Sequence, residues 1–127
     1  HPPQHVWEFL TKPELLEQWL GKTDFQPIVG HKFRFVSPYG NDSYCEVLEV
    51  EPFTRLSYSW QKNSLKDSMP FISKVAWTLT PKDNGTELQL VHNGFIALED
   101  LAGHKNGWSN CLQKFGELIS TIFVDGI

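Results

Sequence analysis

The sequence predicts an α+β fold in which a curved antiparallel sheet wraps around one long helix near the C-terminal end. Between residues 32 and 94, apolar and polar residues alternate with a period of two, as in strands that bury one face. Between residues 107 and 123, apolar residues recur at the three- and four-residue spacing of an amphipathic helix. Such a helix must bury its apolar side, and the sheet is the only large partner that the sequence offers.

Two short helices are expected ahead of the sheet. Residues 4–10 have the spacing of a first helix with one apolar side. The segment from Thr11 to Glu14 fits a capping box, with Thr11 as the cap of a second helix that continues to Leu20. Gly21 stands where a left-handed helix stop is expected. The chain from this stop to the first strand is expected to be an irregular link.

Five strands in a meander should follow. The clearest alternation places Leu56, Tyr58 and Trp60 on one face, opposite Ser57 and Ser59. Short connections with turn chemistry, at residues 38–42 and at Asp83-Asn84-Gly85, imply antiparallel pairing of neighbouring strands. The expected strand bounds are 32–37, 44–51, 55–61, 73–80 and 86–93.

The C-terminal helix is expected over residues 107–123, because its apolar positions fall on one side. A thiol on such an apolar stripe behaves as a small hydrophobic group. The stripe comprises Trp108, Cys111, Leu112, Phe115, Leu118, Ile119, Ile122 and Phe123.

Length and composition limit the possible functions. No repeat or linker divides the 127 residues, so residues 1–127 are interpreted as a single domain. The formal net charge of −4 disfavours a nucleic-acid surface, which needs clustered Lys and Arg. No apolar run approaches the length of a membrane span. Cys45 and Cys111 are too few for a disulfide framework or a zinc site, and we interpret both as free thiols in the reducing cytoplasm.

No cofactor and no metal are expected. The sequence contains no Gly-rich phosphate loop, no serine nucleophile elbow and no zinc signature. His1 and His5 stand four residues apart, but Pro2 and Pro3 interrupt the helical turn that would bring them together. These patterns leave no residue that must be catalytic.

Motifs along nearly the whole chain occur in the order typical of one family. They are Val6–Leu15 with Trp19, Gly30–Phe35, Val50–Pro52, Leu56–Trp60, Gly85–Leu88, His92–Phe95 with His104, and Gly107–Leu112. In these segments the chain resembles the activator of Hsp90 ATPase homologue family, within the helix-grip superfamily of START-related and Bet v-like domains (SRPBCC). Family members begin with a strand ahead of the first helix, to which only His1–Pro3 could belong here. The strand is missing from these 127 residues, so either it has been trimmed from the sequence or the sheet has an exposed edge here.

The resemblance implies a cavity between the concave face of the sheet and the C-terminal helix. Loops expected at residues 63–70 and 96–105 could border its entrance. The same side chains could instead interlock into a solid core, and the sequence leaves both possibilities open. The residues predicted to bind a ligand are Phe33, Phe35, Tyr58, Trp60, Val75, Trp77, Leu90 and His92 from the strands, and Trp108, Cys111, Leu112 and Phe115 from the helix.

His92 is the polar candidate in this set. It shares a strand face with Leu88 and Leu90, so it should point inward. Its imidazole could bind a ligand or act as an acid or base near neutral pH. It could equally be satisfied by a backbone group or by Tyr58. His104, which lies before the predicted helix, is expected to brace the loop there.

Three functions from different classes remain open. Binding of a small hydrophobic or amphipathic molecule is favoured, because the predicted inner face is rich in aromatic residues and poor in polar groups. A partner role beside an Hsp90-type chaperone is the second, and it is implied by the resemblance. The third is an enzyme of the polyketide cyclase or hydrolase kind, as some relatives in the superfamily are, with His92 and Tyr58 as its best pair. The ligand and the oligomeric state cannot be predicted.

Overall fold

The fold of the chain is taken from a computed structural model. It describes residues 2–36, 42–63, 66–82, 85–95, 97–118 and 122–125, with the backbone alone for residues 117, 118 and 122–125. Its elements, in chain order, are α1 (Pro3–Thr11), α2 (Pro13–Trp19), β1 (Lys22–Thr23), β2 (Lys32–Val36), β3 (Ser43–Glu51), β4 (Arg55–Asn63), β5 (Pro70–Lys82), β6 (Gly85–Asn93), α3 (Leu98–Leu118) and β7 (Ile122–Asp125).

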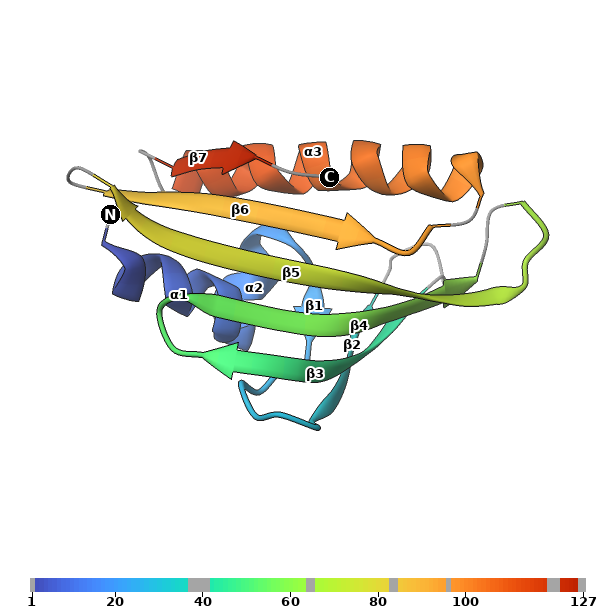
Figure 1. The fold of residues 1–127 in the computed structure, drawn as a ribbon, viewed down its shortest axis with the longest axis horizontal. Coiled ribbons are helices and arrows are strands. Elements are labelled where there is room, and N and C mark those ends of the chain that lie inside the picture. Colours follow the sequence, from blue (N-terminus) through green and yellow to red (C-terminus); the bar gives the residue numbers. More distant parts are fainter. Residues whose placement is uncertain are drawn as a thin grey trace.

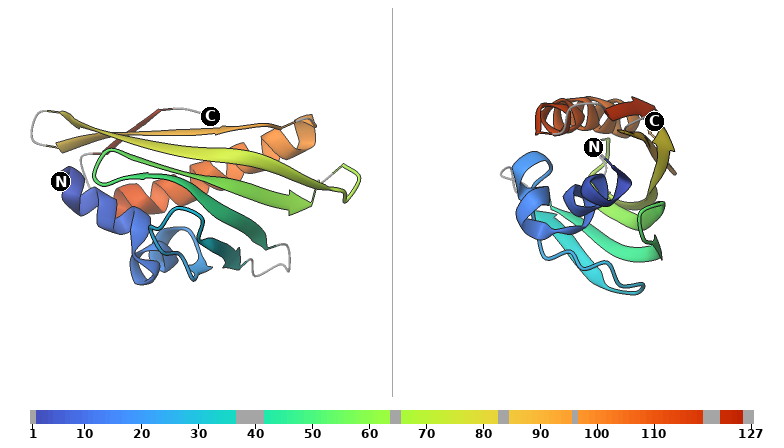
Figure 2. Two further views of the ribbon diagram at one scale, coloured as in Figure 1. Left: turned by 60° about the horizontal axis from the view of Figure 1, so that its bottom comes forward. Right: turned by 90° about the vertical axis from the view of Figure 1, so that its left-hand side faces the viewer.

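The strands form one sheet in chain order, and β1 to β6 are all antiparallel. In the end-on view of Figure 2, the sheet curls around α1 and α2, and α3 closes the remaining side. Figure 1 shows that α1 lies at the end of the sheet where α3 ends, whereas α3 begins near the connection between β4 and β5. The predicted α+β fold, a curved sheet around a long helix, is confirmed.

The predicted alternation is visible in the burial of β5 and β6, but on β4 Ser57 is buried as well, although it lies on the opposite face from its neighbours. Along β4, Leu56, Tyr58 and Trp60 are buried on the concave face. Their cross-strand partners on β5 include Trp77, opposite Leu56, and Val75, opposite Tyr58. The concave face is therefore a continuous apolar surface that faces the helices.

The helix corner differs from its prediction. Thr11 is the last residue of α1 and its hydroxyl donates to the Trp7 carbonyl oxygen at 2.8 Å, so it does not cap α2. Lys12 occupies the cap position of α2 without a side-chain hydrogen bond. Gly21 donates its N–H to the Leu16 carbonyl, but its φ of 158° is extended backbone and not the predicted left-handed stop. The capping-box pattern failed because a threonine also fits the last turn of a helix, where its hydroxyl bonds back to a carbonyl.

The C-terminal helix begins nine residues earlier than predicted, at Leu98. Two of its inward positions in this first part, Asp100 and His104, are polar, so only the half-buried Leu101 extends the apolar pattern that begins at Trp108. The expected loop at 96–105 is thus mostly helix. His104 lies within α3 and not in a loop ahead of it.

The last predicted helical turn is also different, because residues 122–125 form β7 and pair in parallel with residues 86–89 of β6. Ile122, Phe123 and Val124 are residue types that favour strands. The link after α2 contains the short strand β1, which pairs with the end of β2. Residues 38–41 and 83–84 of the two predicted turns lie outside the described residues, as do Ile119, His1 and residues 64–65.

Candidate functional site

The candidate site is the interior between the concave sheet face and α3. All twelve residues predicted to bind a ligand have their side chains in this interior. Ten of them are buried, and Cys111 and Leu112 are half-buried against the same core. The buried ones are Phe33, Phe35, Tyr58, Trp60, Val75, Trp77, Leu90, His92, Trp108 and Phe115.

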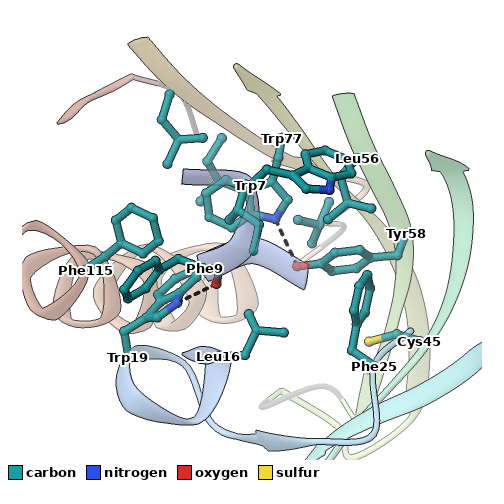
Figure 3. Packing of buried hydrophobic residues seen from close by; sticks show 14 of the residues in the cluster. Trp7, Phe9, Leu16, Trp19, Phe25, Cys45, Leu56, Tyr58, Trp77 and Phe115 are labelled. Atoms are coloured by element: carbon teal, nitrogen blue, oxygen red, sulfur yellow. Dashed lines mark hydrogen bonds between the residues drawn. The ribbon is translucent and has the colours of Figure 1, made fainter. Parts of the chain in front are cut away.

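One end of the interior is tightly packed by α1 and α2. Trp19 lies edge-on to Phe115, with ring centroids 4.5 Å apart, and its indole N–H donates to the Phe9 carbonyl oxygen at 2.9 Å. Phe9 and Trp77 pack against the same pair, as Figure 3 shows. We call these four residues the packed end. Their dense contacts correspond to the solid core that the sequence left as one possibility.

Tyr58 faces the middle of the interior. Its hydroxyl oxygen accepts a hydrogen bond from the Trp77 indole N–H at 2.9 Å (Figure 3). Burial raises the pKa of the Tyr58 phenol, so it stays protonated at neutral pH. Tyr58 packs edge-on against Phe33, with ring centroids 5.2 Å apart. The predicted pairing of Tyr58 with His92 is therefore replaced by a Tyr58–Trp77 pair.

At the opposite end, His92 uses both ring nitrogens. Its Nδ1 accepts the Trp108 indole N–H at 2.9 Å, which places the ring proton on Nε2. Nε2 then donates to the Ser73 hydroxyl at 2.7 Å, and that hydroxyl donates to the Trp60 carbonyl oxygen at 3.2 Å. Burial is the main reason that the pKa of His92 falls to about 3, and the neighbouring His104 lowers it further. His92 is therefore neutral near pH 7.

His104 belongs to the same chain of hydrogen bonds. Its Nε2 accepts the Trp60 indole N–H at 3.2 Å, and its Nδ1 donates to the Asp100 backbone oxygen at 2.7 Å. Burial lowers the pKa of His104 despite the opposing effect of the Asp100 backbone bond. Both histidines are thus neutral tautomers whose protons are set by their neighbours. We call Trp60, Ser73, His92, His104 and Trp108 the histidine end of the interior.

Gly94 allows the chain to leave β6 beside this cluster. Its φ of +99° is a conformation that glycine adopts at little cost. A Cβ atom here would lie 3.1 Å from the Cα of Ser73, closer than ordinary contact. Phe95 follows at once and packs on His92, with ring centroids 4.5 Å apart. Gly94 therefore holds Phe95 over the histidines.

The outer margin of the histidine end is less closed than the packed end. The rings of Phe71 and Phe95 lie near one another at a tilt, with ring centroids 6.0 Å apart, yet both are only half-buried. Lys62 is opposite Phe71 in the β4–β5 pairing and is also half-buried. Aromatic surface and one cation thus lie at the edge of the interior.

Sequence reasoning missed Ser73 and Lys62. Ser73 lies two residues before Val75, and Lys62 lies two residues after Trp60, so both continue an inward-facing alternation. The alternation includes both positions, but its inward face was recognised only by apolar residues, and Ser73 and Lys62 are polar. Extending the period of two by one more step at each strand end would have found them.

The two cysteines are free thiols, and burial raises the pKa of Cys45 and of Cys111. Neither is therefore an activated thiolate at neutral pH. Among the residues that the structure describes, no group of His, Cys, Asp and Glu is arranged to hold a metal ion. In the same part of the chain, no helix is both long and apolar enough to cross a membrane.

Comparison with protein families now bears on this site. Residues 1–120 match the family described as Activator of Hsp90 ATPase homolog 1-like protein. The chain belongs to this family. Its membership confirms the resemblance found in the motifs. No curated protein matches the chain.

Solved structures share the fold. A protein from Mesorhizobium loti is 39% identical and has a TM-score of 0.84, over 94% of this chain and 89% of that one. DynU16, a protein in the dynemicin biosynthetic locus, is 26% identical with a TM-score of 0.77, and the match covers 95% of this chain but 44% of DynU16. CalU16 from Micromonospora echinospora is 24% identical with a TM-score of 0.73, covering 94% of this chain and 68% of CalU16, and shows the fold alone.

Proposed function

We propose that this member of the family binds a small hydrophobic or amphipathic molecule between the sheet and α3, at the histidine end. The observation that supports this proposal is the contrast between the two ends of the interior. Side chains of the packed end are buried, whereas Phe71 and Phe95 pack on the histidines at the other end and stay half-buried, as do Cys111 and Leu112 on α3 between Trp108 and Phe115. Half-buried aromatic and aliphatic side chains with a few polar groups are typical of small-molecule sites.

Acid–base catalysis is less well supported than binding. His92 has both nitrogens engaged, and its pKa lies far below neutral pH, so it neither accepts nor releases a proton easily there. Tyr58 is bonded to Trp77 and has a raised pKa. The free thiols favour a reducing compartment, and we expect the protein to work in the cytoplasm.

The first test is native mass spectrometry of gently purified protein, compared with the same sample after denaturation. We expect an additional mass that only the folded protein carries, and its identity would name the ligand class. Binding of a fluorescent apolar probe, N-phenylnaphthylamine, gives a second readout. Absence of both an added mass and probe binding would contradict the proposal.

A matched pair of variants locates the site. Cys111→Phe adds a large side chain to the half-buried inner side of α3, so it should reduce probe affinity about tenfold or more by occupying the ligand's space. Gln113→Phe adds the same side chain at an exposed position of α3 and should leave affinity unchanged. Equal effects of the two variants would place the probe elsewhere.

The family's description supports one other role, as a partner of an Hsp90-type chaperone. A pull-down with Hsp90 at moderate salt tests it. Capture that is unaffected by Cys111→Phe, together with no ligand by mass spectrometry, would favour the chaperone role over ligand binding.

A further inference from the structure

Lys62 points into the interior, whereas the other lysines in the described strands are exposed. It follows Trp60 by two residues on β4, and its cross-strand partner is Phe71. Phe71 in turn packs on His104, with ring centroids 6.1 Å apart. By contrast, Gln61 and its partner Ile72 are exposed on the convex face. The ammonium of Lys62 therefore belongs to the concave side, at the margin of the histidine end.

The positive charge of Lys62 is only weakly compensated. Burial lowers its pKa, and Asp42 is the carboxylate that opposes this effect. Asp42 also pairs with Arg34 at 3.6 Å, so its charge is shared with a second cation. Within the described residues, no ion pair or hydrogen bond to the Lys62 ammonium is found. A half-buried ammonium without a close partner loses hydration without a compensating bond.

The other titratable groups around it do not supply the missing negative charge. His92 and His104 are neutral, and the positive charge of Lys62 is one cause of their low pKa values. The Cys45 thiol from β3 also feels Lys62, yet burial keeps it protonated. Asp100 of α3 is buried and acts on the His104 ring, and it is not among the causes of the lowered pKa of Lys62. The margin of the histidine end thus combines a cation with aromatic walls.

Resting on the proposed function, we infer that the ligand is an amphipathic organic anion, whose single oxyanion head binds Lys62 while its apolar body lies along Trp60, Phe71 and Phe95. An oxyanion provides the charge-assisted hydrogen bonds that none of the described residues gives to the ammonium. The flat aromatic walls suit an aromatic or aliphatic body. A neutral molecule of the same shape would fill the space but leave the ammonium unpaired.

The test uses two fluorescent probes that share an aromatic body. Anilinonaphthalene sulfonate carries one negative charge, and N-phenylnaphthylamine carries none. Lys62→Met removes the charge at nearly constant length, Lys62→Arg keeps it, and Lys74→Met makes the same change on the exposed convex face. Dissociation constants for both probes are measured on all four proteins, with Lys62→Gln replacing Lys62→Met if the latter does not fold.

We expect Lys62→Met to weaken binding of the sulfonate by about tenfold or more, because a hydrogen bond to a charged group is lost. Lys62→Arg and Lys74→Met should retain it, and N-phenylnaphthylamine should bind all four proteins equally. Unchanged sulfonate binding in Lys62→Met would overturn the inference. If Lys62→Met weakens binding of both probes equally, the inference is also overturned, but the proposal that the protein binds a ligand stands. If neither probe binds the unmodified protein, the inference fails, and the proposed function fails with it when mass spectrometry also finds no added mass.

Discussion

Four of the five buried indole N–H groups have a specific acceptor among the described residues. Trp19, Trp60, Trp77 and Trp108 donate to a backbone carbonyl, an imidazole, a phenol and a second imidazole, respectively. A buried indole needs such a partner because an unsatisfied donor loses the hydrogen bond that water gave it. Trp7 differs, since no hydrogen bond to its indole is found within the described residues.

This difference makes Trp108→Phe informative. Trp108→Phe leaves Nδ1 of the buried His92 without a donor. Trp7→Phe makes the same reduction in side-chain size but breaks no hydrogen bond among the described residues. We therefore expect Trp108→Phe to lower the free energy of unfolding by about 1–3 kcal/mol more than Trp7→Phe does. Urea denaturation of both variants measures the difference. Equal losses would mean that packing, and not the hydrogen bond, is what Trp108 contributes.

Among the elements, the strands were predicted best. A period of two assigns every residue of a strand to a face, so errors at strand ends left the central inward residues unchanged and missed terminal ones such as Lys62. Helix ends were predicted poorly, because they depend on which backbone groups find a partner. Thr11 bonds within α1, and the first turns of α3 place polar Asp100 and His104 inward. Neither arrangement is visible in hydrophobic spacing.

In the candidate site, too, hydrophobic periodicity predicted which residues are buried but not which hydrogen bonds they make. Alternation in the strands and spacing in the helix correctly placed the twelve residues predicted to bind a ligand in the interior, since burial follows from periodicity. The hydrogen bonds among Ser73, His92 and Trp108 were not, because they join three elements whose relative rotation no sequence pattern specifies. Partner choice in a buried polar network depends on tertiary packing.

The corner between α1 and α2 offers a test at this scale. Lys12 caps α2 with extended backbone but no side-chain hydrogen bond, and its exposed ion pair with Glu8, at 3.7 Å, contributes little. Lys12→Ser supplies a hydroxyl that accepts from the first turn of α2, whereas Lys12→Ala does not. We expect Lys12→Ser to be more stable than Lys12→Ala by about 1 kcal/mol in thermal or urea unfolding. The reverse order would show that the corner geometry prevents capping.

The whole molecule divides its interior between a packed end and a histidine end. Helices α1 and α2 fill the first, beside the end of α3 (Figure 1), and the two neutral histidines lie in the second, on β6 and in the first turns of α3. Apolar packing is insensitive to protons, so acid should act on the molecule through the histidine end. The packed end gives the fold its apolar stability, while the histidine end makes that stability depend on pH.

The direction of this dependence follows from His92. Its pKa is about 3 in the folded protein and 6.5 in an unfolded chain, so the unfolded state binds the proton more readily. Its contribution to stability is complete above about pH 6.5 and is lost as the pH falls toward 3. Between pH 7 and pH 5 the loss should be about 2 kcal/mol from His92 alone. His104, whose pKa is also lowered, acts in the same direction.

Urea unfolding at several pH values between 7 and 5 measures this loss. His92→Gln keeps an acceptor for Trp108 and a donor for Ser73 but does not titrate, so its stability should depend less on pH. An undiminished slope in His92→Gln would show that His92 is solvated in the folded state, because only a buried neutral imidazole couples folding to acid in this way.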